Sequence, residues 1–508
     1  MRKIGLACAL LLLAGCVGLP QHVIKYRSEA LRSPQSTTLG RIAEESAEGI
    51  PPSLSGIRLL NSGEEAFDSL IALADHAERT LDIQYYIIHQ DESSRTLLRH
   101  VRAAADRGVR VRVLVDDLNT AGEDRRFMHL EQHANISVRV FNPFPGGRSA
   151  TWSRILTSIS DIPRINHRMH NKLFVADNSL AITGGRNIGN EYFMRDKRSN
   201  FIDLDVAAAG PIVPQLSASF DAFWNSKYAY PIASLAAPVP VEALPPPPPP
   251  PLALAESGSA GDGNWLAREL DAHELHLTWV AATVLADRPA KIASESSPDQ
   301  EVTIANNIAA LMRSAQQEVV VISPYFVPGT AGVALIRKLR ERGVHIRILT
   351  NSLASTDSPL VHNGYARYRV ALLKLGVELS EVRPQLGQKR PRFHPFRTSH
   401  ASLHAKALVI DQKTVFIGSL NMDERSARLN SELGLVIRSP EIARQVTSLL
   451  DDISADGSYR LALDPHDRIV WSSGEPGAER IWHKDPETTL LQRFTLDLLA
   501  PFAPEELL

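Results

Sequence analysis

The chain reads Arg168-Met169-His170-Asn171-Lys172-Leu173-Phe174-Val175-Ala176-Asp177 and, shortly after, Gly184-Gly185-Arg186-Asn187. The same spaced pattern, H-x-K-x4-D-x6-G-G/S-x-N, returns 234 residues later at His404, Lys406, Asp411, Gly418-Ser419 and Asn421. A single H-x-K match carries little weight, because short motifs occur by accident. Two copies with every internal spacing kept predict a duplicated unit and one functional site built from both copies.

Each copy places its histidine and its lysine at the start of a short strand. The runs Leu173–Ala176 and Ala407–Ile410 are apolar and end at turn residues, which predicts buried strands. Alternation along a strand puts the histidine and the lysine on one face, and the following glycine turn is expected to return the asparagine towards them. The candidate site therefore contains His170, His404, Lys172, Lys406, Asn187 and Asn421.

This set of side chains suits chemistry at a phosphate group. Ammonium and amide groups donate hydrogen bonds to phosphate oxygens. Two histidines can divide the roles of nucleophile and acid. The alternative is that the histidines are hydrogen-bonded core residues and the lysines are surface charges, and the second intact copy argues against it.

The doubled pattern resembles the phospholipase D superfamily. More narrowly, His170–Tyr192, Ser402–Val436 and Ser323–Gly329 are similar to the bacterial cardiolipin synthase C group, and the resemblance extends from about Pro51 to the C-terminus. It implies a phosphatidyltransferase that forms cardiolipin from phosphatidylglycerol, with phosphatidylethanolamine or another phosphatidylglycerol as the donor. It implies no cofactor and no metal.

The resemblance also implies a role for each site residue. One histidine, His170 by family habit, attacks the phosphodiester to form a phosphohistidine, and His404 protonates the departing alcohol. In each half a downstream carboxylate is expected to orient the histidine of its own half. These carboxylates are Glu432 in the second half and Asp203, with Asp205 as an alternative, in the first. The motif residues Asp177 and Asp411 end their strands, and we expect their role to be structural.

Other reactions remain open at this point. With water as the acceptor the same site makes a phospholipase D that releases phosphatidic acid. A nuclease of the same superfamily is disfavoured by the net charge of −2, so no nucleic acid partner is expected. A lipoprotein scaffold without catalysis ranks last, because both motifs are intact. The donor lipid and the need for an auxiliary protein are left open.

The N-terminus indicates a membrane-anchored lipoprotein. Arg2 and Lys3 precede an apolar run of signal-peptide length that ends in Leu13-Ala14-Gly15-Cys16, which resembles a lipoprotein processing box. We expect a signal peptide over 1–15, lipid on Cys16 and a tether over 16–50. The protein would face the periplasm, and Val17 favours the outer membrane. The chain has only two cysteines, so a mature form beginning at Cys16 has no structural disulfide.

The remaining chain predicts two similar α/β domains over 51–235 and 266–460. Strand and helix patterns alternate in the same order in both, and Arg107-Gly108 and Arg342-Gly343 close equivalent helices. We predict duplicated α/β/α domains with mainly parallel sheets, packed with pseudo-twofold symmetry around one composite active site. A proline-rich linker over 236–265 joins them. In the C-terminal extension, 461–508, Asp485 is expected to cap a helix that buries Leu491, Phe494 and Leu498.

Overall fold

The computed structural model describes residues 18–148, 153–154, 157–158, 161–238, 264–293, 303–386, 399–474, 479–490 and 492–493. The predicted signal peptide, Cys16, most of the proline-rich linker and the C-terminal apolar face lie outside these residues. Their structures therefore stay predictions. Within the described ranges, no helix combines the length and the hydrophobicity needed to cross a membrane.

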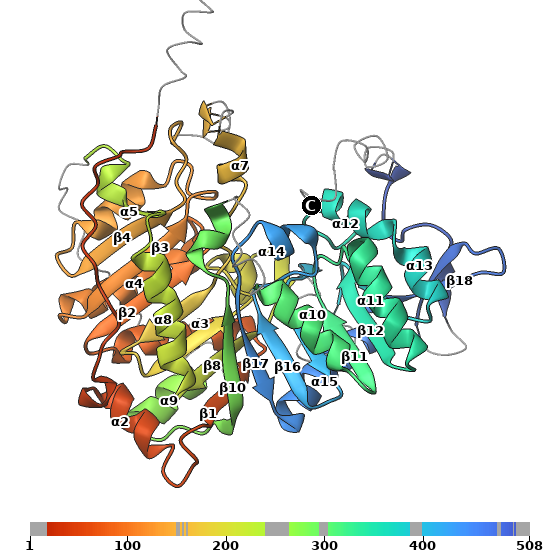
Figure 1. Cartoon of the computed structure of the whole chain (residues 1–508), viewed down its shortest axis with the longest axis horizontal. Coiled ribbons are helices and arrows are strands. Elements are labelled where there is room, and N and C mark those ends of the chain that lie inside the picture. Colours follow the sequence, from red (N-terminus) through yellow and green to blue (C-terminus); the bar gives the residue numbers. More distant parts are fainter. Residues whose placement is uncertain are drawn as a thin grey trace, which may run out of the picture.

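Each half contains the same succession of strands and helices, seen side by side in Figure 1. The first half contains β1 (Ser55–Leu60), α3 (Gly63–His76), β2 (Thr80–Tyr85), α4 (Glu92–Asp106), β3 (Arg110–Asp116), α5 (Asp124–Glu131), β4 (Ile136–Phe141), β5 (Leu173–Ala176), β6 (Leu180–Gly184), β8 (Asp205–Ala209), α8 (Ile212–Trp224) and β9 (Ala229–Pro231). The second contains β10 (Thr278–Ala286), α10 (Ile304–Ser314), β11 (Glu318–Ile322), α11 (Gly329–Glu341), β12 (His345–Asn351), α12 (Pro359–Ala366), α13 (Arg369–Lys374), β13 (Glu378–Val382), β15 (Ala407–Ile410), β16 (Thr414–Gly418), β17 (Leu433–Arg438), α15 (Pro440–Asp456) and β18 (Ser458–Leu463).

Local sequence explains where the helices begin and end. Ser62 caps α3 through the amide of Glu65, and Asp91 caps α4 in a reciprocal pair with Ser94. Gly108 and Gly343 follow α4 and α11 with φ of 98° and 82°, a conformation that glycine adopts without strain. The predicted equivalence of these two helix ends is confirmed.

The strands form one sheet that is symmetric about its centre. Its spatial order is β9-β4-β3-β2-β5-β6-β8-β1-β10-β17-β16-β15-β11-β12-β13-β18, and β19 (Ile469–Ser473) and β20 (Arg480–Trp482) extend the second half. The antiparallel pair β1–β10 lies at the middle, where Gly56 faces Trp279. The order on one side mirrors the order on the other, which confirms the predicted pseudo-twofold symmetry. The domain boundaries stay a prediction, and β18 spans the one placed at residue 460.

The prediction of mainly parallel sheets was wrong. Among the described strands of this sheet, only β2-β3-β4 and β11-β12-β13 run parallel, as the helices between them require. The strand of each motif instead belongs to an antiparallel hairpin, β5–β6 or β15–β16. The hairpin turns are Asp177-Asn178 and Asp411-Gln412, all with φ of 51° or 52°. Two left-handed residues in succession are typical of the tight turn that joins antiparallel strands.

Hydrophobic cores lie on both faces of this sheet. One core lies against α8 and α15 and runs continuously through both halves, with Phe220 on α8 and Ile453 on α15 fully buried in it. The opposite face has two separate cores, one beneath α3 and α4 and one beneath α10 and α11. The shared core holds the two halves against each other.

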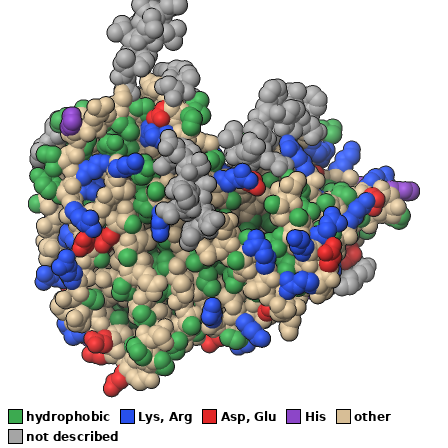
Figure 2. Space-filling model, in the orientation of Figure 1, with side chains coloured by type: hydrophobic (Ala, Val, Ile, Leu, Met, Phe, Trp, Pro, Cys, Tyr) green, Lys and Arg blue, Asp and Glu red, His purple; other side chains and the backbone are tan. Residues whose placement is uncertain are grey.

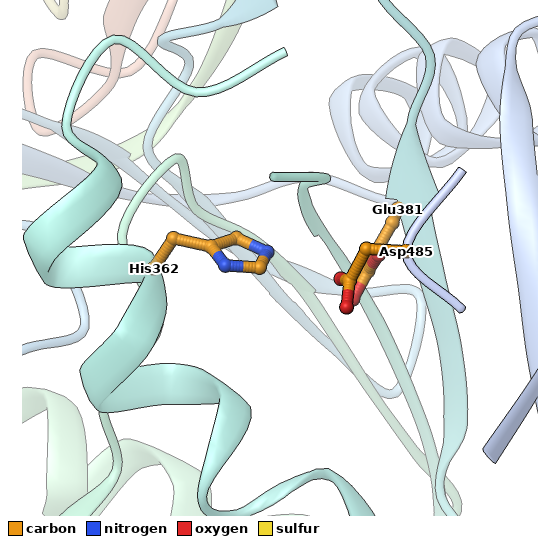
Figure 3. Close-up of side chains that lie close together, drawn as sticks. All are labelled: His362, Glu381 and Asp485. Atoms are coloured by element: carbon orange, nitrogen blue, oxygen red, sulfur yellow. The ribbon is translucent and has the colours of Figure 1, made fainter. Parts of the chain in front are cut away.

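A buried charge cluster fixes the C-terminal segment to the second half. Figure 3 shows His362 of α12 pointing towards the carboxylates of Glu381 and Asp485. Arg369 joins all three: its Nη2 donates to His362 Nε2 at 2.8 Å and pairs with Glu381 and Asp485 at 2.8 and 3.0 Å. A guanidinium thus occupies the place where these groups would hold a metal ion. The expected capping role of Asp485 was wrong, because its carboxylate pairs with Arg369, and Thr489 accepts from the Gln492 amide instead.

Replacing Arg369 is expected to destabilise the fold strongly. Arg369→Leu leaves Glu381, which is fully buried, without its ionic partner, so we expect a loss of ~3–5 kcal/mol of unfolding free energy. Lys374→Ala is the matched control, because the Lys374–Asp467 pair is more than half exposed and such pairs contribute ~0–1 kcal/mol. Urea denaturation of both variants measures the difference. Equal losses would contradict a structural role for the buried cluster.

Candidate active site

The segment before each motif strand pairs with the opposite half of the chain. The parallel ladder between β7 (Ser199–Ile202) and β14 (His400–Leu403) ends at His404, whose amide donates to Ile202 O at 2.8 Å. In the symmetric position Met169 bridges Ser431, and the His170 amide donates to Ser431 O at 2.9 Å. Each histidine backbone is therefore attached to the residue that precedes the carboxylate of the other half.

This pairing crosses the histidine–carboxylate contacts. His170 Nδ1 lies 2.9 Å from Glu432 Oε2, and His404 Nδ1 lies 2.5 Å from Asp203 Oδ2. The expectation that each carboxylate orients the histidine of its own half was wrong. The inter-half backbone pairing places the carboxylates beside the opposite histidines, and no pattern within one half reveals it.

Asp203, not Asp205, is the carboxylate at the first-half position. Arg186 engages Asp205 through its Nη1, at 3.1 Å, and through its backbone amide, at 3.2 Å. The same guanidinium donates to the carbonyl of Asp203 at 2.6 Å, which holds the turn between the two acids. The alternative that the sequence left open is thereby decided.

The contacts at Nδ1 determine which histidine nitrogen can react. An ionised carboxylate only accepts hydrogen bonds, so it fixes the proton on Nδ1 of the ring that it contacts. Nε2 of His170 and of His404 then remains for a substrate. Both rings are buried, with 7% and 6% exposure, and each meets the edge of a tyrosine: Tyr86 with centroids 5.0 Å from His170, and Tyr192 at 5.2 Å from His404.

The motif lysines lie against the same two histidines. Lys172 Nζ donates to the carbonyl of His170 at 2.6 Å, and Lys406 Nζ donates to the carbonyl of His404. Burial lowers the pKa of Lys406 to about 8 and that of Lys172 well below its usual value. Burial also lowers the pKa of His170 strongly, with further lowering by Lys172, Lys406 and His404, so groups from both halves act on one another. This is the predicted composite site.

The two carboxylates differ in their proton affinity. Burial raises the pKa of Glu432 to about 7, although the charge of Lys172 opposes the rise. Burial acts on Asp203 in the same direction, but His404, Lys406 and Arg186 outweigh it and lower its pKa to about 2. A firmly ionised Asp203 supports a positive charge on His404 better than Glu432 supports one on His170. The two histidines are therefore not equivalent.

A serine in one motif and a glycine in the other contribute to this difference. Ser419 Oγ donates to Glu432 and also accepts from the amide of Leu433 at 3.0 Å. At the matching position of the first motif, a Cβ added to Gly185 would lie 2.1 Å from Asp203 Oδ1. A serine therefore has no room there, and only Glu432 has a hydroxyl partner of this kind.

The motif asparagines also differ. Asn187 is held by protein groups at both ends of its amide, since Oδ1 accepts from the Ile87 amide at 3.2 Å and Nδ2 donates to Tyr192 Oη at 3.0 Å. Asn421 is buried, and its Oδ1 has no hydrogen-bond partner among the described residues. A phosphate-binding role for either asparagine stays a prediction.

The motif aspartates lie at the far ends of their strands, as the spacing predicted. Asp177 accepts from the amides of Glu78, Arg79 and Thr80 at 2.7–2.9 Å. Asp411 does the same for residues 316–318 at 2.7–3.1 Å. Each carboxylate thus joins its hairpin turn to the start of the neighbouring strand, which is a structural role.

Several site residues were missed from the sequence. Tyr86, Tyr192 and Phe201 contact the histidine rings, but an aromatic residue near a motif is not a specific signal. Two arginines just before the first motif are paired with carboxylates, Arg168 with Asp116 and Arg164 with Asp161. Figure 2 shows Lys and Arg over both halves of one face rather than in one patch.

Comparison with known proteins finds similarity to cardiolipin synthases. A family profile described as "Cardiolipin synthase, PLD-like domain" matches residues 70–224 and 308–453. Cardiolipin synthase C of Escherichia coli (strain K12) is 39% identical over 464 residues, which cover 90% of this chain and 97% of that protein. An uncharacterized protein of Helicobacter pylori (strain J99 / ATCC 700824) is 31% identical over 94% of both chains.

A solved structure supports the fold. The phosphatidylserine synthase of Haemophilus influenzae Rd KW20 superposes with a TM-score of 0.57 at 15% identity, over 92% of this chain and 100% of that one. At this identity the likeness concerns the fold alone. It agrees with two repeated α/β units in one chain.

The crossed contacts predict which histidine each carboxylate affects. In Asp203→Asn, His404 loses an ionised acceptor, so its pKa, which burial and Lys406 already lower, should fall further. The pKa of His170 should change less. The catalytic rate should drop ~100- to 10,000-fold. Nitrogen-15 spectra of histidine-labelled protein measure both titrations, with His170→Gln and His404→Gln for assignment. Glu432→Gln is the matched variant and should affect His170. A larger pKa change in His170 than in His404 in Asp203→Asn would contradict the crossed arrangement.

Proposed function

The chain belongs to the cardiolipin synthase family with phospholipase D-like domains, and from this premise we propose that it is a phosphatidyltransferase that makes cardiolipin. The observation that carries the proposal is the composite site, in which each of two buried histidines contacts, through its Nδ1, a carboxylate of the other half. Two lysines complete it. Both acceptor and donor are phospholipids: phosphatidylglycerol accepts, and a second phosphatidylglycerol or phosphatidylethanolamine donates.

In the first step His170 Nε2 attacks the phosphorus of the donor lipid. The bond from phosphorus to the head-group alcohol breaks, and His404 gives its proton to the leaving oxygen. The product is a phosphatidyl group on His170 and a free glycerol or ethanolamine. Lys172 and Lys406 balance the charge that develops on the phosphoryl oxygens. The strongly lowered pKa of His170 and the ionised Asp203 beside His404 support this division of roles.

In the second step the acceptor replaces the histidine. A hydroxyl of the phosphatidylglycerol head group gives its proton to His404 and attacks the phosphorus. The bond from phosphorus to His170 breaks, which releases cardiolipin and restores both histidines. Water in place of this hydroxyl would give phosphatidic acid, so the burial of both rings favours transfer over hydrolysis.

We also propose that a lipid on Cys16 directs the site towards the membrane. The carbonyl of Leu31 accepts from Asn178 in the β5–β6 turn, at the strand end remote from His170. Lys25 instead donates to Lys227 O, next to Tyr228, whose carbonyl accepts from Asn142 at the end of β4. From Leu31 back to Lys25 the chain therefore runs towards the end of the strands at which the histidines lie. An anchor preceding Lys25 would hold this end of the strands near the bilayer. The choice of the outer membrane remains a prediction.

Lipid products test the reaction directly. Protein lacking residues 1–16, given phosphatidylglycerol vesicles with and without phosphatidylethanolamine, should form cardiolipin that mass spectrometry detects. His170→Ala should abolish it. Release of ethanolamine would identify phosphatidylethanolamine as the donor. Phosphatidic acid without cardiolipin would overturn the transferase proposal in favour of a phospholipase D.

The pH dependence should have two limbs. Below about pH 7 Glu432 takes up a proton and no longer fixes the proton on His170 Nδ1, so kcat/KM should fall. Above about pH 8 Lys406 loses its charge, so kcat/KM should fall again. Lys406→Arg keeps a positive charge at high pH and should remove the alkaline limb, whatever its effect on the absolute rate. An unchanged alkaline limb in this variant would contradict the assignment to Lys406.

A further inference from the structure

We propose that an apolar pocket in the second half holds an acyl chain of a phospholipid substrate. The pocket lies between α10, α11 and α14 (Glu424–Arg428), opens to solvent and has a cavity volume of about 160 Å³. Apolar side chains line most of it, among them Ile308, Met312, Phe326, Leu335, Ile336 and Met422. An apolar cavity of this size has room for a segment of an acyl chain rather than for a whole lipid.

The pocket includes a residue of the second motif among those that line it. Asn421, the asparagine of the second motif, lines one end, and its buried Oδ1 has no partner among the described residues. The backbone fixes this end, because Val327 N donates to Met422 O at 2.7 Å and Met422 N donates to Ser323 Oγ at 3.2 Å. A ligand bound in this pocket would therefore lie beside Asn421 of the second motif. The presence of a motif residue in the pocket favours the substrate itself as the occupant.

The first half shows why the space exists. Phe193 and Ala427 each stand six residues after the motif asparagine, and Phe67 and Ala305 each stand ten residues before the residue that ends their helix, Ala77 or Ala315. In the first half the phenylalanine rings are buried and pack with centroids 4.8 Å apart. The second half has an alanine at both positions, and both alanines line the pocket. The pocket thus results from smaller side chains in an equivalent framework.

A third replacement acts in the same way. Leu97 on α4 and Gly332 on α11 each stand eleven residues before the glycine that ends their helix. Leu97 is buried in the core of the first half, whereas Gly332 lines the pocket. Three positions that fill the first half are therefore opened in the second. The proposed reaction requires one enzyme to bind two diacyl lipids. The apolar pocket beside the second motif can hold the hydrocarbon of one of them.

The charges at the rim are consistent with a hydrocarbon occupant. Asp423 and Glu424 line the same pocket, but both are engaged locally. Asp423 accepts from the Ser426 amide at 2.7 Å to cap α14, and Glu424 pairs with Arg428 at 2.5 Å. Two carboxylates disfavour an anionic head group at this position. An uncharged acyl chain meets no such repulsion.

Filling the pocket with the residues of the first half tests the proposal. Ala427→Phe and Ala305→Phe, made separately, each restore a first-half ring, and either variant suffices if the other fails to fold. Gly332→Leu is avoided, because a Cβ there would lie 2.8 Å from Cβ of Pro328. Ala334→Phe, on the exposed side of α11, is the matched control. Binding of decanoyl lysophosphatidylglycerol by calorimetry and cardiolipin formation from dioleoyl phosphatidylglycerol are measured for all.

We expect binding of the lysolipid to weaken ~10-fold or more in the filled variants and to stay unchanged in Ala334→Phe. Cardiolipin formation should fall mainly through KM. Unaltered binding and turnover in folded, filled variants would overturn the proposal and would indicate another occupant, such as a side chain of a partner protein. The inference rests on the proposed function, but the two can fail separately. If the enzyme forms no cardiolipin but its filled variants still lose lysolipid binding, the proposed pocket is retained and the proposed reaction is rejected.

Discussion

The exchange of backbone hydrogen bonds between the halves is the constraint on which the site depends. The amide of each histidine donates to the carbonyl that precedes the carboxylate of the opposite half. Once these bonds form, the side chains that follow them meet: His170 with Glu432 and His404 with Asp203. The central β1–β10 pair and the shared core beneath α8 and α15 hold the halves in the position that permits the exchange. The active site is thus a product of the interface rather than of either domain.

The interface also explains why two copies of one motif can take different roles. The strands and turns are nearly identical, yet the carboxylates differ by one methylene and by their surroundings. Glu432 has the hydroxyl of Ser419 as a partner, whereas Asp203 is packed so closely on Gly185 that a side chain would collide with it. Asp203 also faces more positive charge. Small differences at equivalent positions therefore separate a histidine suited to attack from one suited to proton transfer.

Much of the fold could be predicted from the sequence because the deciding signals are local. The strands over 173–176 and 407–410, the glycines that end α4 and α11, and the structural role of the motif aspartates all follow from short patterns. The failures concern contacts between distant segments. The hairpin direction of β5 and β15, the crossed histidine partners and the pairing of Asp485 with Arg369 depend on tertiary packing, which local periodicity does not encode. The aromatic contacts of the histidines belong to the same class.

The crossed contacts carry a consequence for the origin of the chain. A protein with a single copy of the repeat could complete its site only by pairing with an identical chain, since its own carboxylate would lie beside the partner's histidine. Fusion of two copies makes this meeting intramolecular and independent of protein concentration. In a dimer of identical chains every substitution appears twice, whereas in the fused chain it appears once. A serine beside one carboxylate, or an alanine that opens space beside one motif, could then accumulate without its counterpart, so that duplication turned a symmetric ancestor into a molecule with two specialised sides.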